Sequence, residues 1–129
     1  MRQRGFTLLE IMVAFLVLAI VFTMVMQLIT GGLQNARRSA NFTEAALLAN
    51  SKMAEIGTLI AIEEGSDQGS FNDRFDWQLE IVLEPIEATG GLSPDSYPLE
   101  LYRINLTVTW RDGNARADYT TLRAVSRDI

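Results

Sequence analysis

Residues 5–29 of the chain have the sequence GFTLLEIMVAFLVLAIVFTMVMQLI. Its apolar part, from Phe6 to Ile29, contains 24 residues, and as an α-helix it would be about 36 Å long at about 1.5 Å per residue. A hydrocarbon core of about 30 Å needs about 20 such residues, so this segment is long enough to cross a bilayer. Arg2 and Arg4 precede it, and their charge is expected to keep the N-terminus on the cytoplasmic side.

One carboxylate interrupts the apolar run. Glu10 is the one charged residue between Gly5 and Arg37, although a charge at the bilayer centre costs about 2.5–3.5 kcal/mol on insertion scales. One interpretation is an interfacial glutamate, because Glu10 lies only about 6 Å along the axis from Phe6 and can snorkel toward the headgroups. The other interpretation begins with cleavage after Gly5. The new amino group of Phe6 would be largely protonated near neutral pH, and Glu10 or a carboxylate of a neighbouring helix would pair with it.

The Gly5–Phe6 junction is the small-residue position that fits a cleavage site, because no Ala-x-Ala sequence directly follows the apolar run. The hexapeptide GFTLLE at residues 5–10 resembles the prepilin peptidase site of type IV pilins and type II secretion pseudopilins. The resemblance implies cleavage between Gly5 and Phe6 by an inner-membrane aspartic peptidase and N-methylation of Phe6. It also implies that Glu10 guides subunit docking in the filament. Residues 1–5 are then a leader peptide, and residues 6–30 a transmembrane and assembly helix.

We expect residues 31–129 to form one periplasmic globular domain. Their composition restricts the functions that this domain can have. Removing Arg2, Arg4 and Glu10 from the 11 basic and 16 acidic residues of the chain leaves 9 and 15, a net charge of −6. This acidic domain argues against nucleic-acid binding, which needs a basic surface. The chain has no histidine and no cysteine, so the usual general bases, thiol nucleophiles and zinc ligands are missing. We therefore expect no enzyme, no catalytic residue and no cofactor.

The segment from Leu33 to about Ile62 has the periodicity of a helix. Its apolar residues recur at spacings of three and four and form one stripe. They are Phe42, Ala45, Ala49, Met53, Ile56 and Ile60. We interpret the stripe as packing on a sheet rather than as a groove for a partner helix. Gly31 and Gly32 precede this segment, and each costs a helix interior about 1 kcal/mol relative to alanine. They form either a flexible joint or part of a continuous helix.

An acidic segment follows the second helix. Glu63–Arg74 is rich in Gly, Ser, Asp and Asn and is predicted to be a surface loop. The acidic residues in and beside it are Glu63, Glu64, Asp67, Asp73 and Asp76. Calcium binding is one interpretation, but the EF-hand order of carboxylates and glycine is missing. We favour a solvated acidic loop and predict no metal site.

Three strands are predicted near residues 75–84, 99–110 and 115–125 from their alternation of apolar and polar residues. Asp112-Gly113 is a strong two-residue hairpin signal between the last two. The proline-containing segment Pro85–Pro98 is a loop and a candidate partner surface. The fold class is therefore α+β: a long N-terminal membrane-spanning helix continues into a helix packed on a small three-stranded antiparallel sheet.

The hairpin turn also predicts a register between its two strands. The expected pairs are Trp110 with Ala115, Thr109 with Arg116, Val108 with Ala117, Thr107 with Asp118 and Leu106 with Tyr119. In this register apolar side chains face apolar ones, and polar side chains face polar ones. A slip of one residue would move every side chain of a strand to the other face of the sheet.

Three segments look like those of I-type minor pseudopilins: residues 46–55, residues 77–81 and residues 101–110. Many type IV pilins carry a C-terminal disulfide loop, so the absence of cysteine favours the pseudopilin side. The resemblance implies a minor pseudopilin of type II secretion that assembles with J- and K-type partners, and with the major pseudopilin, at the tip of a pseudopilus. The pseudopilus is thought to push folded proteins through an outer-membrane channel. Before assembly, the chain would be a single-pass inner-membrane protein whose C-terminal domain lies in the periplasm.

Two alternatives belong to other functional classes. One is a minor type IV pilin that serves pilus assembly, adhesion or DNA uptake, and the acidic domain counts against its DNA-binding version. The other is a single-pass membrane protein with a periplasmic binding domain that never polymerises. That protein would keep Gly5 uncut and would tolerate changes at Glu10.

Overall fold

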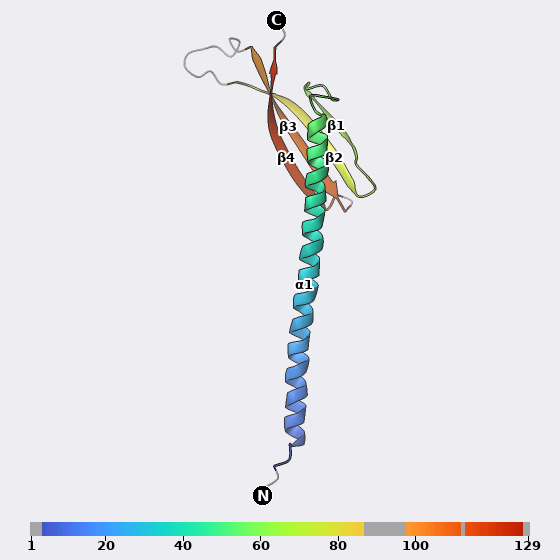
Figure 1. Cartoon of the computed structure of the whole chain (residues 1–129), viewed down its shortest axis with the longest axis vertical. Coiled ribbons are helices and arrows are strands. Elements are labelled where there is room, and N and C mark those ends of the chain that lie inside the picture. Colours follow the sequence, from blue (N-terminus) through green and yellow to red (C-terminus); the bar gives the residue numbers. More distant parts are fainter. Residues whose placement is uncertain (1–3, 87–97, 112, 128–129) are drawn as a thin grey trace. The chain divides into compact units, whose positions relative to one another are not determined.

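The computed structural model describes residues 4–86, 98–111 and 113–127 (Figure 1). Its elements in chain order are α1 (Leu8–Glu55), β1 (Gly65–Ser70), β2 (Phe75–Glu84), β3 (Leu99–Trp110) and β4 (Ala115–Ser126). The chain divides into two compact units, Met1–Asn41 and Phe42–Ile129. Helix α1 supplies the first unit and also the first element of the second, which we call the globular unit.

Helix α1 is continuous through Gly31 and Gly32. A Cβ atom added at either glycine would meet nothing within 4 Å. Neither glycine is therefore required by a close contact with another of the described residues. The structure agrees with the continuous-helix interpretation of this point.

Helix α1 ends at Glu55, so the predicted end near Ile62 is wrong by seven residues. The backbone turns here because Gly57 adopts a φ of +90°, a conformation that favours glycine at a helix C-terminus. The amides of Leu59 and Ile60 donate to the Glu55 carbonyl at 2.8 and 2.9 Å. The apolar periodicity continues past the stop signal, which is why it overestimates the helix length.

The four strands form one antiparallel sheet in the order β1-β2-β3-β4. The three predicted strands are present as β2, β3 and β4. The predicted hairpin register is confirmed at all five pairs, for example between Trp110 and Ala115 and between Leu106 and Tyr119. The turn includes Gly113 at a φ of +86°, where a residue with a side chain would be strained.

Strand β1 corrects the prediction of a surface loop over Glu63–Arg74, because Gly65–Ser70 pairs with β2 along its whole length. The sheet consequently has four strands rather than three. The sequence of β1, GSDQGS, contains no apolar or β-branched residue, so strand propensity gives no signal there. Backbone pairing and the contact of Gly69 with the Trp77 ring hold this strand in place.

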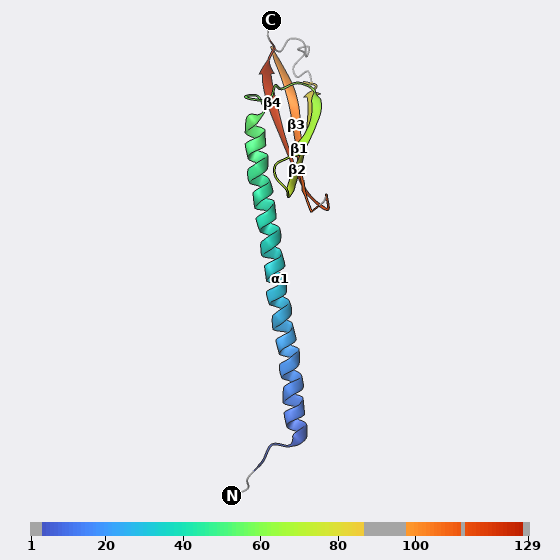
Figure 2. The same ribbon diagram turned by 90° about the vertical axis from the view of Figure 1, so that its right-hand side faces the viewer.

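The core of the globular unit lies between one face of the sheet and the C-terminal part of α1. This part of the helix lies beside the sheet in both views (Figures 1 and 2). Ala45 and Ala49 are the buried residues of the helix. The buried residues of the sheet are Phe75, Trp77, Leu79, Ile81, Ile104, Leu106, Val108 and Trp110. Small alanines allow the helix to approach the sheet closely, and the predicted packing role of the apolar stripe is confirmed.

Candidate functional site

The predicted cleavage junction lies just outside the helix. Residues 4–7 are non-helical, and α1 begins at Leu8. Gly5 is exposed, and the Phe6 side chain is 81% exposed. The Gly5–Phe6 peptide bond is therefore free of helical hydrogen bonding and accessible, as proteolysis requires.

Thr7 fixes the start of α1. Its Oγ1 accepts a hydrogen bond from the Glu10 amide at 3.2 Å, and its carbonyl accepts one from the Ile11 amide at 3.2 Å. Thr7 is thus the N-cap, and Glu10 occupies the third helical position. This cap was not predicted from the sequence, although Thr-x-x-Glu is a recognisable helix-start signal.

The cap sets the position of the carboxylate. Glu10 lies in the first turn of α1, where the positive end of the helix dipole favours an acidic side chain. Phe6 and Glu10 line the same shallow surface groove. The other residues that line it are Ile11, Ala14, Phe15 and Leu18. The groove therefore combines an apolar wall with one carboxylate.

The helix that follows is apolar and exposed up to Ile29. An 18-residue window of α1 has a mean hydropathy of 2.8 and no buried residue, so by length and composition the helix could cross a membrane. Two hydroxyls within it are satisfied internally. Thr23 donates to the Ala19 carbonyl at 2.8 Å, and Thr30 donates to the Met26 carbonyl at 2.9 Å. Hydroxyls bonded in this way can enter hydrocarbon at low cost.

The acidic residues that were candidate calcium ligands are not clustered into one site. Asp67 accepts from the Gln68 amide at 2.8 Å, Glu64 accepts from the Leu83 amide at 3.0 Å, and Asp76 accepts from the Ser70 hydroxyl. Among the described residues there is no group of three or more His, Cys, Asp or Glu side chains placed to hold a metal ion. Most of the Pro85–Pro98 loop, the candidate partner surface, lies outside the described residues.

The comparisons with known proteins point to one family. The family described as the prokaryotic N-terminal methylation motif matches residues 1–26. The chain is 32% identical over 127 residues to type II secretion system protein I of Xanthomonas campestris pv. campestris, covering 96% of this chain and 92% of the relative. No solved structure matches. The matched motif contains Gly5, Phe6 and Glu10.

Proposed function

We propose, since the chain belongs to the type II secretion system protein I family, that it acts as a minor pseudopilin near the tip of a periplasmic pseudopilus. It supports the export of folded proteins across the outer membrane as a structural subunit and not as an enzyme. The observation that carries this proposal is the placement of Glu10. It is an acidic residue in the first helical turn, beside Phe6, in a segment whose other residues up to Ile29 are uncharged and exposed.

The proposed route begins in the inner membrane. The apolar helix inserts with Arg2 and Arg4 on the cytoplasmic side, and the globular unit faces the periplasm. Prepilin peptidase cuts the accessible Gly5–Phe6 bond, and the new N-terminus of Phe6 is methylated. The methylated amine remains a cation at neutral pH, so it can still pair with a carboxylate.

Glu10 then favours assembly over the membrane. In lipid, the carboxylate has no fixed partner and must stay near the interface. In a bundle of pseudopilin helices, it can pair with the N-terminal amine of Phe6 in its own or a neighbouring subunit. A charge pair is strong in surroundings that exclude water, provided that both charges are satisfied. The apolar residues around Glu10 pack against the adjacent helices of the filament.

The partners in this proposal are the J- and K-type minor pseudopilins and the major pseudopilin. Two properties of the chain support a periplasmic structural role. The net charge of −6 after the membrane segment suits a dispersed domain, and the sheet is stabilised without disulfides because the chain has no cysteine.

A deletion strain tests the proposal when secreted enzyme activity in the medium and surface pili are scored in parallel. We expect the enzymes to accumulate in the periplasm while pili stay intact, and a copy of the full chain to restore secretion. Normal secretion with lost pili would instead identify a minor type IV pilin. Normal secretion with normal pili would contradict both assignments.

Processing is tested on the same complementing copy by measuring the mass of the purified protein. We expect a chain that begins at Phe6 and carries one additional methyl group. A chain that still contains residues 1–5 would support the third possibility, a membrane protein that is never assembled.

A further inference from the structure

The two edges of the sheet differ in length and in their free backbone groups. Strand β4 has 12 residues, with neither glycine nor proline, and it pairs with β3 through 12 consecutive pairs without a bulge. The Arg127 amide donates to the Pro98 carbonyl at 2.8 Å, in the same register as these pairs. Because hydrogen-bonded pairs alternate along an antiparallel ladder, the odd-numbered residues of β4 bond to β3.

The even-numbered residues of β4 therefore direct their backbone groups away from the sheet. They are Arg116, Asp118, Thr120, Leu122, Ala124 and Ser126. No side chain within the described ranges caps one of these amides. Natural proteins usually shorten, bend or cover such an edge, because it is a template for another strand.

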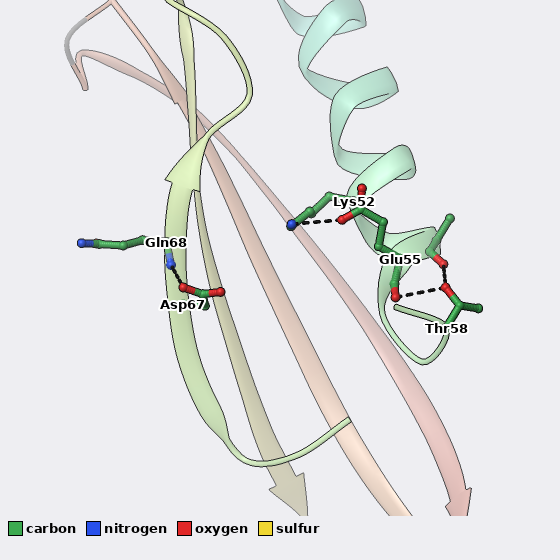
Figure 3. Close-up of polar contacts among 6 residues, drawn as sticks. Lys52, Glu55, Thr58, Asp67 and Gln68 are labelled. Carbon is green, nitrogen blue, oxygen red and sulfur yellow. Dashed lines mark hydrogen bonds and ion pairs between the residues drawn. The ribbon is translucent and has the colours of Figure 1, made fainter. Parts of the chain in front are cut away.

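Strand β1, the opposite edge, is shorter and is protected at one of its outward amides. It has six residues, two of them glycine. The Phe71 amide bonds to the Phe75 carbonyl at 2.9 Å, so the same alternation leaves Gln68 with its amide directed outward. The Asp67 carboxylate accepts a hydrogen bond from that amide at 2.8 Å (Figure 3). A strand that approached β1 would have to displace this carboxylate.

The side chains along β4 indicate what kind of strand would fit. Ala117 and Tyr119 are half-buried on the face of the sheet that carries the core. Arg123 lies on the same face, is exposed, and has no ion-pair partner among the described residues. An added strand would therefore place apolar residues beside Ala117 and Tyr119 and a carboxylate beside Arg123.

Antiparallel pairing with the β4 strand of a second copy does not suit a membrane-anchored subunit. Antiparallel pairing of two β4 strands creates a two-fold axis that is normal to the sheet. Within the globular unit, α1 lies along the face of the sheet (Figure 2), so this axis would reverse the helix in the second copy. Two subunits anchored in one membrane must run in the same direction, which excludes this arrangement.

We infer that the free edge of β4 binds an extended segment of a different pseudopilin, which continues the sheet as a fifth strand through the outward backbone groups of residues 116–126. The segment carries apolar residues on the core side and an acidic residue opposite Arg123. This inference rests on the proposed function and names the surface through which the subunit recognises its neighbour.

Proline at position 120 tests the edge. Thr120→Pro removes an outward amide and leaves the ladder to β3 intact, whereas Thr121→Pro removes an amide that belongs to the ladder. Thr120→Val is the matched control, because it keeps the amide but also loses the hydroxyl bond from Thr120 to Asn105. Each variant of the full chain is expressed in the deletion strain and purified in mild detergent with the other pseudopilins.

We expect Thr120→Pro to lose co-purification and secretion, while Thr120→Val behaves as the wild type. Thr120→Pro and Thr120→Val should have similar melting temperatures. Secretion and co-purification of Thr120→Pro at the wild-type level would overturn the inference. If the wild-type chain itself fails to restore secretion, the proposed function falls, and that outcome is distinguishable because it does not depend on position 120.

A second measurement does not depend on how the proline variants fold. The natural chain has no cysteine, so Leu122→Cys on β4 and Gln68→Cys on β1 each provide one attachment point for a thiol-linked photo-crosslinker. Adducts with another pseudopilin are expected from position 122 and not from position 68. Equal adducts from both positions, or none from position 122, would overturn the inference.

Discussion

A Cβ atom at Gly69 would lie 2.8 Å from Cζ2 of Trp77, so strand β1 can cross the indole ring only because residue 69 is glycine. The same ring contacts the Lys52 ammonium, whose Nζ lies 4.1 Å from the ring centroid. Lys52 also pairs with Glu55 at 3.0 Å (Figure 3). Trp77 thus joins the end of α1 to the edge strand of the sheet.

Gly69→Ala is expected to destabilise the globular unit by about 1–3 kcal/mol, the usual cost of an extra methyl group in a tightly packed site. Gly65→Ala is the matched control, because a Cβ there meets nothing within 4 Å. The measurement is thermal unfolding of the full chain in detergent, followed by tryptophan fluorescence. Equal melting temperatures for the two variants would contradict the close contact of β1 with Trp77.

Thr7→Ala is expected to fray the first turn of α1, because loss of an N-cap typically costs about 1 kcal/mol. Amide hydrogen exchange at Glu10 and Ile11 should become faster, since both amides bond to Thr7. Thr7→Ser keeps the hydroxyl and should exchange as the wild type does. Unchanged protection in Thr7→Ala would show that Thr7 does not cap the helix.

Asp118 provides a prediction about pH. The Thr107 hydroxyl and the Arg116 guanidinium, both 2.7 Å from its carboxylate oxygens, lower the pKa of Asp118. Because the folded-state pKa is the lower one, the stabilisation is present above the unfolded value of about 3.9 and is lost as the pH falls through the folded value. With the side chain 51% exposed, we expect no more than about 1 kcal/mol.

The check is the free energy of unfolding of the wild type and of Asp118→Asn as a function of pH. The wild type should be the more stable of the two at pH 7, and the difference should shrink as the pH falls below about 3.9. A constant difference across this range would contradict the depressed pKa of Asp118.

Gly31→Ala and Gly32→Ala are expected to stabilise α1 by up to about 1 kcal/mol each, because both positions are helical and have room for a methyl group. Thermal melts of the full chain in detergent, followed by far-ultraviolet circular dichroism, should show equal or higher helix content. Reduced helicity would contradict a helical conformation at these two positions.

The hairpin was predictable from the sequence because two independent signals agree on it. Asp112-Gly113 locates the turn, and the alternation of β3 and β4 then permits one register. The packing stripe of α1 was predictable for a similar reason, since Ala45 and Ala49 recur at helical spacing and are buried.

Strand β1 was not predictable, because its stabilisation comes from β2 and Trp77 and not from its own residues. The end of α1 at Glu55 was missed for a different reason. The glycine at position 57 was visible, but the apolar spacing continues to Ile60, which packs against the core from outside the helix. In the candidate site, the Gly5–Phe6 junction and the lone carboxylate of Glu10 stand out in the sequence, while the Thr7 cap was overlooked.

In the proposed function, the carboxylate of Glu10 converts an apolar membrane helix into an assembling subunit. The most direct measurement compares Glu10→Gln, Glu10→Asp and Thr23→Val in the deletion strain, by secretion and by co-purification of other pseudopilins from detergent-solubilised membranes. We expect Glu10→Gln to insert and accumulate normally but to lose partners and secretion, Glu10→Asp to retain part of both, and Thr23→Val to be unaffected. Normal assembly and secretion by Glu10→Gln would contradict this role of Glu10.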